Sequence, residues 1–390
     1  MSARVTVVGL GPGDPALRTV GAQAALDRAD RIVLRTLIHP GLDDLAADSR
    51  AIGCDDLYEG GASFDEVYAA VADRVLGEAA ARQDGEVVFA VPGHPRFGER
   101  SVRLLTERAA AAGVGVEVQA ATSALDVVAV AVDADPFGDE LQLRDALDLV
   151  DAVEREPFGG GLIALDPSRP CLVNQVYAPA VAASVKLALA RLYPDDHPVV
   201  VVRAAGVPSQ ERLSRCRLFE LDRQSVDHLT SVWVLPLPPL EAHRSPQTLQ
   251  RIVAHLRAPG GCPWDRKQTH GSLRSALIEE AYETVDAIDA GDADNLAEEL
   301  GDLLLQVALH AQIAEEAGGF VLEDVYEHVS AKLLRRHPHV FGDVEARTPD
   351  DVVTTWEAVK AAERANAGDE RPEHPLDRLP RSMPALTRAA

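Results

Sequence analysis

A proline-rich segment divides this chain of 390 residues into two parts with different sequence patterns. Prolines occupy positions 236, 238, 239 and 246 within the run Pro236–Pro246. Because proline lacks a backbone N–H and restricts its own φ angle, neither a central strand nor a helix continues through such a run. We therefore expect a linker over residues 236–247 between two domains, which agrees with the usual size of protein domains.

Strand-like and helix-like patterns alternate before this linker. Val5–Val8 is an apolar strand pattern, a glycine-rich loop follows it, and a helical pattern covers about Pro15–Ala29. Alternation of this kind is typical of an α/β fold with substantial parallel pairing, whereas the pattern from Gln247 onward is helical. The sequence therefore predicts a multidomain chain: an α/β domain over residues 1–235, an all-α domain over 248–364, and an extended tail over 365–390. Further strands are expected at 32–34, 86–91, 116–118, 199–202 and 231–235.

The composition narrows the classes of partner and compartment. The formal net charge is −24, so the chain lacks the cationic excess that binding to a nucleic-acid backbone requires. A small anionic substrate remains compatible with this charge if metal ions mediate its binding. No apolar run reaches the roughly 18 residues of a membrane span, and the first residues do not resemble a signal peptide. The four scattered cysteines suit a reducing cytoplasm.

Two helices joined by a tight turn are expected after residue 271. Ser272 is a candidate cap for the first helix, which runs to about Ala290, and Gly291–Asp294 forms the turn and caps the second helix. A turn this short makes the two helices antiparallel neighbours. Each helix carries an apolar stripe that is expected to be buried: Leu273, Leu277, Ala281, Val285 and Ile288 in the first, and Leu296, Leu300, Leu303, Leu304 and Val307 in the second.

Paired carboxylates border both stripes. Glu280 and Glu283 are three residues apart, as are Glu299 and Asp302, so each pair shares a helix face. Packing the helices together would gather four like charges, which is destabilising without a cation. Oxygen ligands favour Mg²⁺ or Mn²⁺ over zinc. A solvated acidic face remains an alternative, and a di-iron bundle is disfavoured because neither pair contains histidine.

Basic and aromatic residues occur in pairs around these helices. Lysine occurs only four times among 38 basic residues, and three of the four lie in the last third of the chain. With the carboxylates, such pairs would complete a site for nucleotide phosphates. Basic residues at a helix end also complement the helix dipole, and tryptophan often packs in a core, so both alternatives remain. The pairs are Lys332 with Arg336, Trp356 with Lys360, and Trp264 with Lys267.

Four motifs occur in this region, in the order Cys262–Thr269 (CPWDRKQT), Glu279–Glu283 (EEAYE), Glu298–Leu304 (EELGDLL) and Lys332–Phe341 (KLLRRHPHVF). Together they resemble the motifs of MazG-type nucleoside triphosphate pyrophosphohydrolases. The resemblance covers about residues 248–364 and implies an all-α, dimeric enzyme that hydrolyses nucleoside triphosphates to the monophosphate and pyrophosphate. It does not indicate which base or sugar is preferred.

The resemblance also implies roles for individual residues. Water would attack the α-phosphorus, with Glu279 or Glu298 as the candidate acceptor of its proton and with Lys332 and Arg336 offsetting phosphoryl charge. The implied ligands of magnesium are Glu280, Glu283, Glu299 and Asp302. The implied substrate-binding residues are Trp264, Lys267, Lys332, Arg336, Trp356 and Lys360.

Glycine-rich loops mark a second candidate site in the first domain. The loop from Gly9 to Pro15 follows a strand and opens a helix, so it allows close backbone approach to an anionic group. With Val91–Gly98 and Ala121–Leu125, it is similar to the tetrapyrrole (corrin/porphyrin) methylases, over about residues 4–235. This family binds S-adenosylmethionine between two α/β subdomains. The implied cofactor-binding residues are Gly11, Gly13, Pro92, Gly93, Thr122 and Ser123.

Three functions follow from these patterns. The leading prediction is a magnesium-dependent pyrophosphohydrolase that removes unwanted nucleoside triphosphates. The second is an S-adenosylmethionine-dependent methyltransferase whose helical domain only dimerises the chain; His94 stands where the family usually has aspartate. The third is a first domain that senses a small molecule and regulates the hydrolase. In each case we expect a homodimer formed through the helical domain, because one apolar stripe per helix pair leaves a core incomplete.

Overall fold

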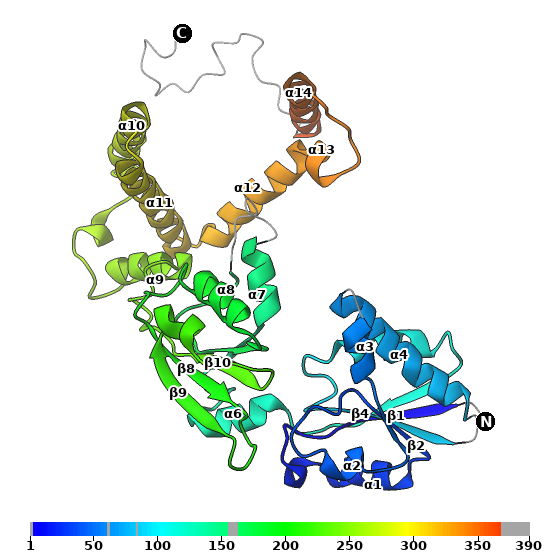
Figure 1. Ribbon diagram of the computed structural model, residues 1–390. Coiled ribbons are helices and arrows are strands. Elements are labelled where there is room, and N and C mark those ends of the chain that lie inside the picture. The colour runs from blue at the N-terminus through cyan, green and yellow to red at the C-terminus, as the bar shows by residue number, and fades with distance from the viewer. Residues whose placement is uncertain (1–2, 61–62, 83–84, 155–162, 368–390) are drawn as a thin grey trace. The chain divides into compact units, whose positions relative to one another are not determined.

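The computed structural model describes residues 3–60, 63–82, 85–154 and 163–367. The chain divides into two compact units, Met1–Thr248 and Leu249–Ala390, hereafter unit 1 and unit 2. Unit 1 contains two five-stranded sheets with helices, and unit 2 is helical (Figure 1). The predicted α/β and all-α classes are therefore confirmed. No helix in the described ranges combines the length and apolar character needed to span a membrane.

The first sheet of unit 1 is wholly parallel, with strand order β3-β2-β4-β1-β5. β1 and β4 read as continuous apolar runs because helices cover both faces of a parallel sheet. α4 and α5 pack on one face, and α1 packs on the other (Figure 1). The elements are β1 (Arg4–Gly9), α1 (Val20–Arg28), β2 (Arg31–Leu34), α2 (Asp43–Ala46), β3 (Ala51–Gly53), α3 (Asp55–Gly60), α4 (Phe64–Ala80), β4 (Glu86–Val91), α5 (Arg100–Ala109) and β5 (Gly115–Val118).

The second sheet is mixed, with order β6-β7-β10-β8-β9 and only the β6–β7 pair parallel. The expectation of parallel pairing therefore holds for the first sheet but not for this one. The edge strand β9 was not predicted from the sequence, because its residues are largely polar and exposed and show no apolar pattern. The elements are α6 (Ala124–Val132), β6 (Gln142–Asp145), α7 (Ala146–Glu154), β7 (Cys171–Asn174), α8 (Pro179–Leu189), β8 (Pro198–Arg203), β9 (Arg212–Arg217) and β10 (Thr230–Val234).

The proline-rich segment packs onto unit 1. Ala242 is fully buried, and the Leu237 N–H donates to the Pro167 carbonyl at 2.8 Å. Thr248 is also buried and donates through its hydroxyl to the Pro239 carbonyl at 3.2 Å. The segment contains no strand, but residues 246 and 247 of the expected linker already belong to helix α9 (Pro246–Arg257), and the segment is anchored to unit 1.

Unit 2 is built from helices around a small core of Val253, Leu273, Ala308 and Leu309. Gly291, at φ +67°, ends α10, and the Asp292 side chain accepts the Asn295 N–H to cap α11. This is the predicted turn between antiparallel helices. The elements are α9 (Pro246–Arg257), a 3₁₀ turn (Asp265–Lys267), α10 (Arg274–Ala290), α11 (Ala293–Glu316), α12 (Leu322–Arg336), α13 (Pro338–Phe341) and α14 (Pro349–Ala367).

Three local expectations in unit 2 require correction. Ser272 does not cap α10, because its hydroxyl oxygen accepts the Thr269 N–H and its proton goes to Gln268. The apolar stripes are largely exposed within one chain: Ile288 is 56% and Leu304 is 59% accessible. α14 continues to Ala367, so the expected tail begins no earlier than residue 368, and residues 368–390 lie outside the described part.

Candidate metal and phosphate site

The α10–α11 hairpin brings three of the four predicted metal ligands together. Carboxylate oxygens of Glu280, Glu283 and Glu299 all lie within 4.8 Å of one another. Glu280 and Glu299 are half-buried and Glu283 is exposed. The i,i+3 spacing on α10 and the antiparallel packing of α11 produce this grouping, because both place the carboxylates on facing helix sides. We refer to these three residues as the carboxylate cluster.

Asp302 stands outside the three-residue cluster but acts on it electrostatically. Desolvation, and then the charges of Asp302, Glu283 and Glu299, raise the pKa of Glu280. Desolvation and the charges of Glu283 and Asp302 likewise raise the pKa of Glu299. Both shifts have the direction expected of carboxylates that repel one another. The two candidate proton acceptors flank the cluster: Glu279 contributes to the shift of Glu280, and Glu298 to that of Glu299.

The cluster is chemically suited to a hard divalent cation. All its donors are carboxylate oxygens, which Mg²⁺ and Mn²⁺ prefer. Among the ion pairs between described residues, none joins a lysine or arginine to Glu280, Glu283 or Glu299. The negative charge of the carboxylate cluster is therefore not offset by an ion pair to a lysine or arginine of the described residues.

The predicted phosphate-binding cations lie on α12 and α14. Arg336 is bound to Glu363, with its Nη2 2.8 Å from the carboxylate, and its guanidinium also lies 5.5 Å from the ring centre of Trp356. His337 contacts the same indole edge-on at 5.0 Å. Lys332 is exposed, and Lys360 lies 3.6 Å from Glu357. Trp356 is therefore engaged by Arg336 and His337, and Arg336 already has an anionic partner.

Within one chain these cations stand apart from the carboxylate cluster. α10 packs along α11, while α12 contacts α14. Figure 1 shows α12 leaving the end of α11 and diverging from the hairpin, with α14 at its far end. The sequence motifs therefore occupy neighbouring helices, but this single chain does not gather all their functional groups at one point.

Trp264 and Lys267 lie on the loop between α9 and α10. Trp264 is 63% exposed, and Lys267 ends the 3₁₀ turn Asp265–Lys267 and is also exposed. Of the two tryptophans singled out in unit 2, Trp264 therefore has the more accessible ring for stacking on a base.

Glu363 is a residue of this region that sequence reasoning missed. It accepts hydrogen bonds from both Arg335 and Arg336, and these bonds hold the pKa of its carboxyl below the usual value. A signal was present in the sequence, because Glu363 lies seven residues, or about two helical turns, after Trp356 and thus shares its face.

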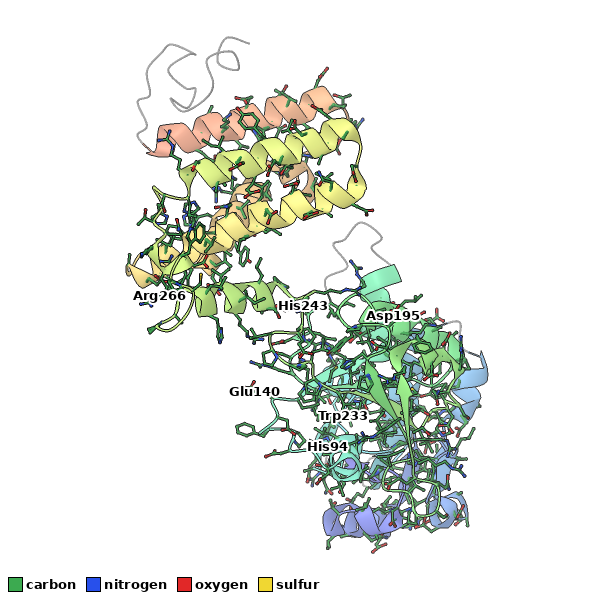
Figure 2. The ribbon with its side chains drawn as sticks, turned by 90° about the vertical axis from the view of Figure 1, so that its left-hand side faces the viewer. His94, Glu140, Asp195, Trp233, His243 and Arg266 are labelled. Carbon is green, nitrogen blue, oxygen red and sulfur yellow. The ribbon has the colours of Figure 1, made fainter. Side chains whose placement is uncertain are left out.

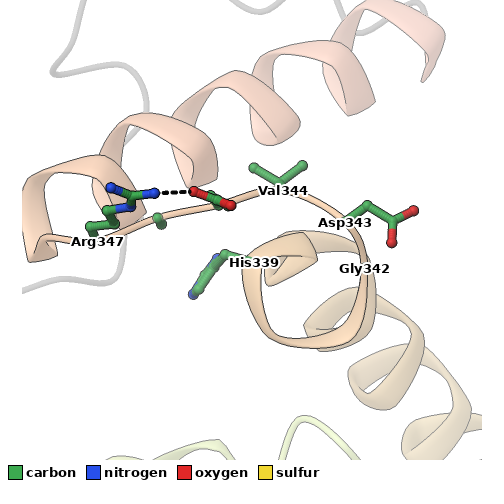
Figure 3. A pocket seen from close by; sticks show the side chains of 7 residues that line it. His339, Gly342, Asp343, Val344 and Arg347 are labelled. Atoms are coloured by element: carbon green, nitrogen blue, oxygen red, sulfur yellow. Dashed lines mark hydrogen bonds and ion pairs between the residues drawn. The ribbon is translucent and has the colours of Figure 1, made fainter.

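An open hollow of about 460 Å³ lies in the segment between α13 and α14 (Figure 3). An ion pair between Arg347 and Glu345 crosses part of its lining at 2.7 Å, and both side chains are highly exposed. None of the predicted site residues lines this hollow, so it does not mark the reaction site. Its lining residues are His339, Gly342, Asp343, Val344, Glu345, Ala346 and Arg347.

The predicted cofactor loops of unit 1 do meet. Gly11 and Gly93 form an isolated antiparallel bridge, in which the Gly93 N–H donates to the Gly11 carbonyl at 2.8 Å. Both glycines have positive φ, at +76° and +66°. The approach requires glycine at position 9 as well, because a Cβ there would lie 2.2 Å from the Gly93 carbonyl oxygen. The loops therefore end β1 and β4 at the carboxyl edge of the parallel sheet, where α/β folds bind ligands.

The remaining predicted cofactor residues join this edge through local bonds. The Thr122 hydroxyl donates to the Leu17 carbonyl at 3.0 Å, which links the loop before α6 to the first glycine loop. Ser123 caps α6 in a reciprocal pair with Asp126. His94, labelled in Figure 2, accepts the Arg96 N–H through Nδ1 at 3.0 Å. Gly13 and Pro92 belong to the same two loops.

Comparison with known proteins finds one family match in unit 1 and another in unit 2. Residues 4–222 match the tetrapyrrole (corrin/porphyrin) methylases, and residues 268–341 match the MazG nucleotide pyrophosphohydrolase domain. The chain is 42% identical over 395 residues to the uncharacterized protein YabN of Bacillus subtilis (strain 168), covering 100% of this chain and 76% of that protein.

Two further similarities each concern one unit. Over 143 residues the chain is 48% identical to the nucleoside triphosphate pyrophosphohydrolase/pyrophosphatase MazG of Thermotoga maritima, which covers 37% of this chain and about half, 53%, of that protein. The structure of uroporphyrin-III-C-methyltransferase from Thermus thermophilus is similar at 17% identity and a TM-score of 0.45, over 63% of this chain and 98% of that one.

The two matched regions follow one another in the order that the sequence motifs predict, and the YabN similarity extends over both. The chain therefore belongs to the family of proteins in which a tetrapyrrole (corrin/porphyrin) methylase domain is followed by a MazG nucleotide pyrophosphohydrolase domain.

Proposed function

We propose that unit 2 hydrolyses nucleoside triphosphates to nucleoside monophosphates and pyrophosphate with the help of Mg²⁺. The observation that carries this proposal is the carboxylate cluster, in which oxygens of three carboxylates on one hairpin lie within 4.8 Å of one another. The 48% identity to a nucleoside triphosphate pyrophosphohydrolase over this region supports the same reaction.

Glu280, Glu283 and Glu299 would hold the ion, with Asp302 beside them. When bound, Mg²⁺ supplies positive charge that offsets the triphosphate and favours ionisation of water. Glu279 or Glu298, next to the cluster in sequence, accepts the proton of the attacking water as the bond to pyrophosphate breaks. Lys332 and Arg336 would offset charge on the phosphoryl oxygens, with further cationic contacts from Lys360 and Lys267. This role requires α12 and α14 to approach the carboxylate cluster, from which they stand apart in the single chain. Trp264 supplies an accessible ring for the base, and Trp356 orients Arg336 through their contact.

The test measures pyrophosphate release from a panel of nucleoside triphosphates, with and without Mg²⁺, by the native chain and by Glu283→Gln. We expect magnesium-dependent release that falls at least about 100-fold in the variant, because a direct ligand contributes no less than the residues that support it. Glu315→Gln is the matched control, since this exposed glutamate lies 16 residues, or about 24 Å, along α11 from Glu299. A folded native chain that releases no pyrophosphate from any triphosphate contradicts the proposal.

We propose in addition that unit 2 forms a homodimer. The apolar stripes of α10 and α11 are exposed in one chain, with Val285 at 48%, Leu300 at 47% and Leu304 at 59% accessibility. Contiguous exposed apolar surface of this kind is typical of a protein interface. Light scattering is expected to give the mass of two chains at micromolar concentration, and of one chain for Leu304→Glu. A one-chain mass for the native protein would rule out this assembly.

We further propose that unit 1 binds S-adenosylmethionine at the meeting of its glycine loops. The Gly11–Gly93 bridge supports binding, whereas His94 in the usually acidic position leaves methyl transfer and ligand sensing as two separate outcomes. Calorimetric titration with S-adenosylmethionine tests binding. Addition of the bound ligand to the pyrophosphate assay then separates the two outcomes, since only sensing changes turnover. The four free cysteines suit a cytoplasmic location for either activity.

A further inference from the structure

A single arginine holds the loop that carries Trp264 and Lys267. Arg257 is the last residue of α9, and its side chain is only 5% exposed. Its guanidinium forms two parallel bonds to Glu316 at the end of α11, with Nε 2.9 Å and Nη2 2.7 Å from the two carboxylate oxygens. This pairing lowers the pKa of Glu316. The bidentate geometry fixes the orientation of the guanidinium plane.

The third nitrogen of the same guanidinium points at the loop. Nη1 of Arg257 donates to the carbonyl of Asp265 and, at 3.3 Å, to the carbonyl of Gln268. These two carbonyls flank Arg266 and Lys267, the residues at the turn of the loop. Arg257 therefore ties the loop at two points to the ends of α9 and α11.

The first residues of the loop pack closely against the end of α9. A Cβ on Gly261 would lie 2.3 Å from the His255 carbonyl oxygen, so the chain passes directly against α9. The Cys262 N–H donates to the Leu256 carbonyl at 2.8 Å. In contrast, the side chains of Trp264 and Lys267 are exposed. The backbone of the loop is therefore held in place, while the side chains of Trp264 and Lys267 are exposed to solvent. Figure 2 shows Arg266 at the turn of the loop, beside α9.

We propose that Arg257 is a positioning residue for nucleotide binding, which holds the 261–268 loop so that Trp264 and Lys267 are presented in one arrangement. The inference rests on the proposed pyrophosphohydrolase function. Arginine is required because one planar group must satisfy a carboxylate on one side and two carbonyls on the other, which the compact ammonium of lysine does not do. Loss of this preorganisation weakens substrate binding more than it slows the chemical step.

The experiment compares Arg257→Lys with the native full chain and with Arg274→Lys, a matched change at an exposed arginine at the start of α10. For Arg257→Lys we expect KM for the preferred triphosphate to rise about tenfold or more, because charge-assisted hydrogen bonds are lost, while kcat stays within about threefold. We also expect trypsin to cleave faster after Arg266 and Lys267, since a released loop opens more often. Arg274→Lys should change neither quantity.

A second variant, Glu316→Gln, removes the partner charge with little change in shape and serves if Arg257→Lys does not fold. It should raise KM and speed tryptic cleavage in the same direction. An unchanged KM, or a fall in kcat alone, overturns the positioning role. If the native chain itself releases no pyrophosphate, the proposed function fails separately. The rates of tryptic cleavage after Arg266 and Lys267 then still decide whether Arg257 holds the loop. Equal rates in the native chain and in Arg257→Lys overturn the proposal that it does.

Discussion

Glu280 and Glu299 are two residues whose negative charges oppose folding. Desolvation, and then the neighbouring carboxylates, raise their pKa values in the folded chain, so at neutral pH folding places both negative charges in an unfavourable environment. The folded protein then binds protons more readily than the unfolded chain. This penalty is present above the folded-state pKa and disappears as the pH falls below about 4.3, the ordinary value for glutamate.

A stability measurement follows at the residue scale. Without metal at pH 7, Glu299→Gln should melt at a higher temperature than the native chain, because one repelling charge is gone. Mg²⁺ at about 100 times its Kd should stabilise the native chain by about 2.7 kcal/mol, and the variant by much less. Differential scanning calorimetry with and without Mg²⁺ measures both effects. A variant that melts lower than the native chain at pH 7 without metal would show that the carboxylates are not in conflict.

At the scale of elements, close approach of the β1 and β4 loops depends on the absence of a side chain at Gly9. A Cβ there would also lie 2.5 Å from that of Ala121, with backbone on the other side. We expect Gly9→Ala to destabilise unit 1 by about 1–3 kcal/mol, the usual cost of overpacking. Urea unfolding followed by circular dichroism measures this change.

Gly77 provides the opposite case within the same unit. It lies inside α4, and a Cβ there would have nothing within 4 Å. Gly77→Ala should therefore stabilise unit 1 by about 0.5–1 kcal/mol, because alanine loses less backbone entropy in a helix. If Gly9→Ala leaves the unfolding midpoint unchanged or raises it, the packing account of Gly9 is wrong, and if Gly77→Ala lowers the midpoint, the account of Gly77 is wrong.

Helix periodicity predicted buried apolar stripes on α10 and α11, and the burial was wrong for the single chain. The spacing of Leu277, Val285 and Ile288 places these residues on one face, yet only Thr284 and Ala287 of α10 are buried in the single chain. Periodicity describes which side chains share a face of a helix. Whether that face is covered depends on what packs against it, and this information lies outside the local sequence.

At the scale of the whole molecule, the two units have separate hydrophobic cores. The core clusters of unit 1 surround its two sheets, and the cluster of unit 2 includes Val253 and Leu309. Separate cores predict two unfolding transitions rather than one. Mg²⁺ should raise the temperature of one transition, and S-adenosylmethionine that of the other. Scanning calorimetry with each ligand checks this, and a single transition shifted by both ligands would show that the units unfold together.

The sequence by itself determined the class of each unit and the hairpin that gathers Glu280, Glu283 and Glu299, and its proline-rich segment ends just before the division between the units at Thr248. These features depend on local rules: proline interrupts regular structure, glycine and aspartate close a turn, and a spacing of three residues fixes a shared helix face. The glycine loops of unit 1 were found for the same reason, because their backbone requirements are visible in the residue types.

Only the tertiary structure decided which distant groups meet. It separated the cations of α12 and α14 from the carboxylate cluster within one chain, paired Arg336 with Glu363, and placed the guanidinium of Arg257 between Glu316 and the Trp264 loop. The ion pairs join residues that are far apart in sequence. The separation of the cations from the carboxylate cluster depends on the direction in which α12 leaves α11 (Figure 1). Local propensity does not specify such contacts, because they result from the packing of whole elements against one another.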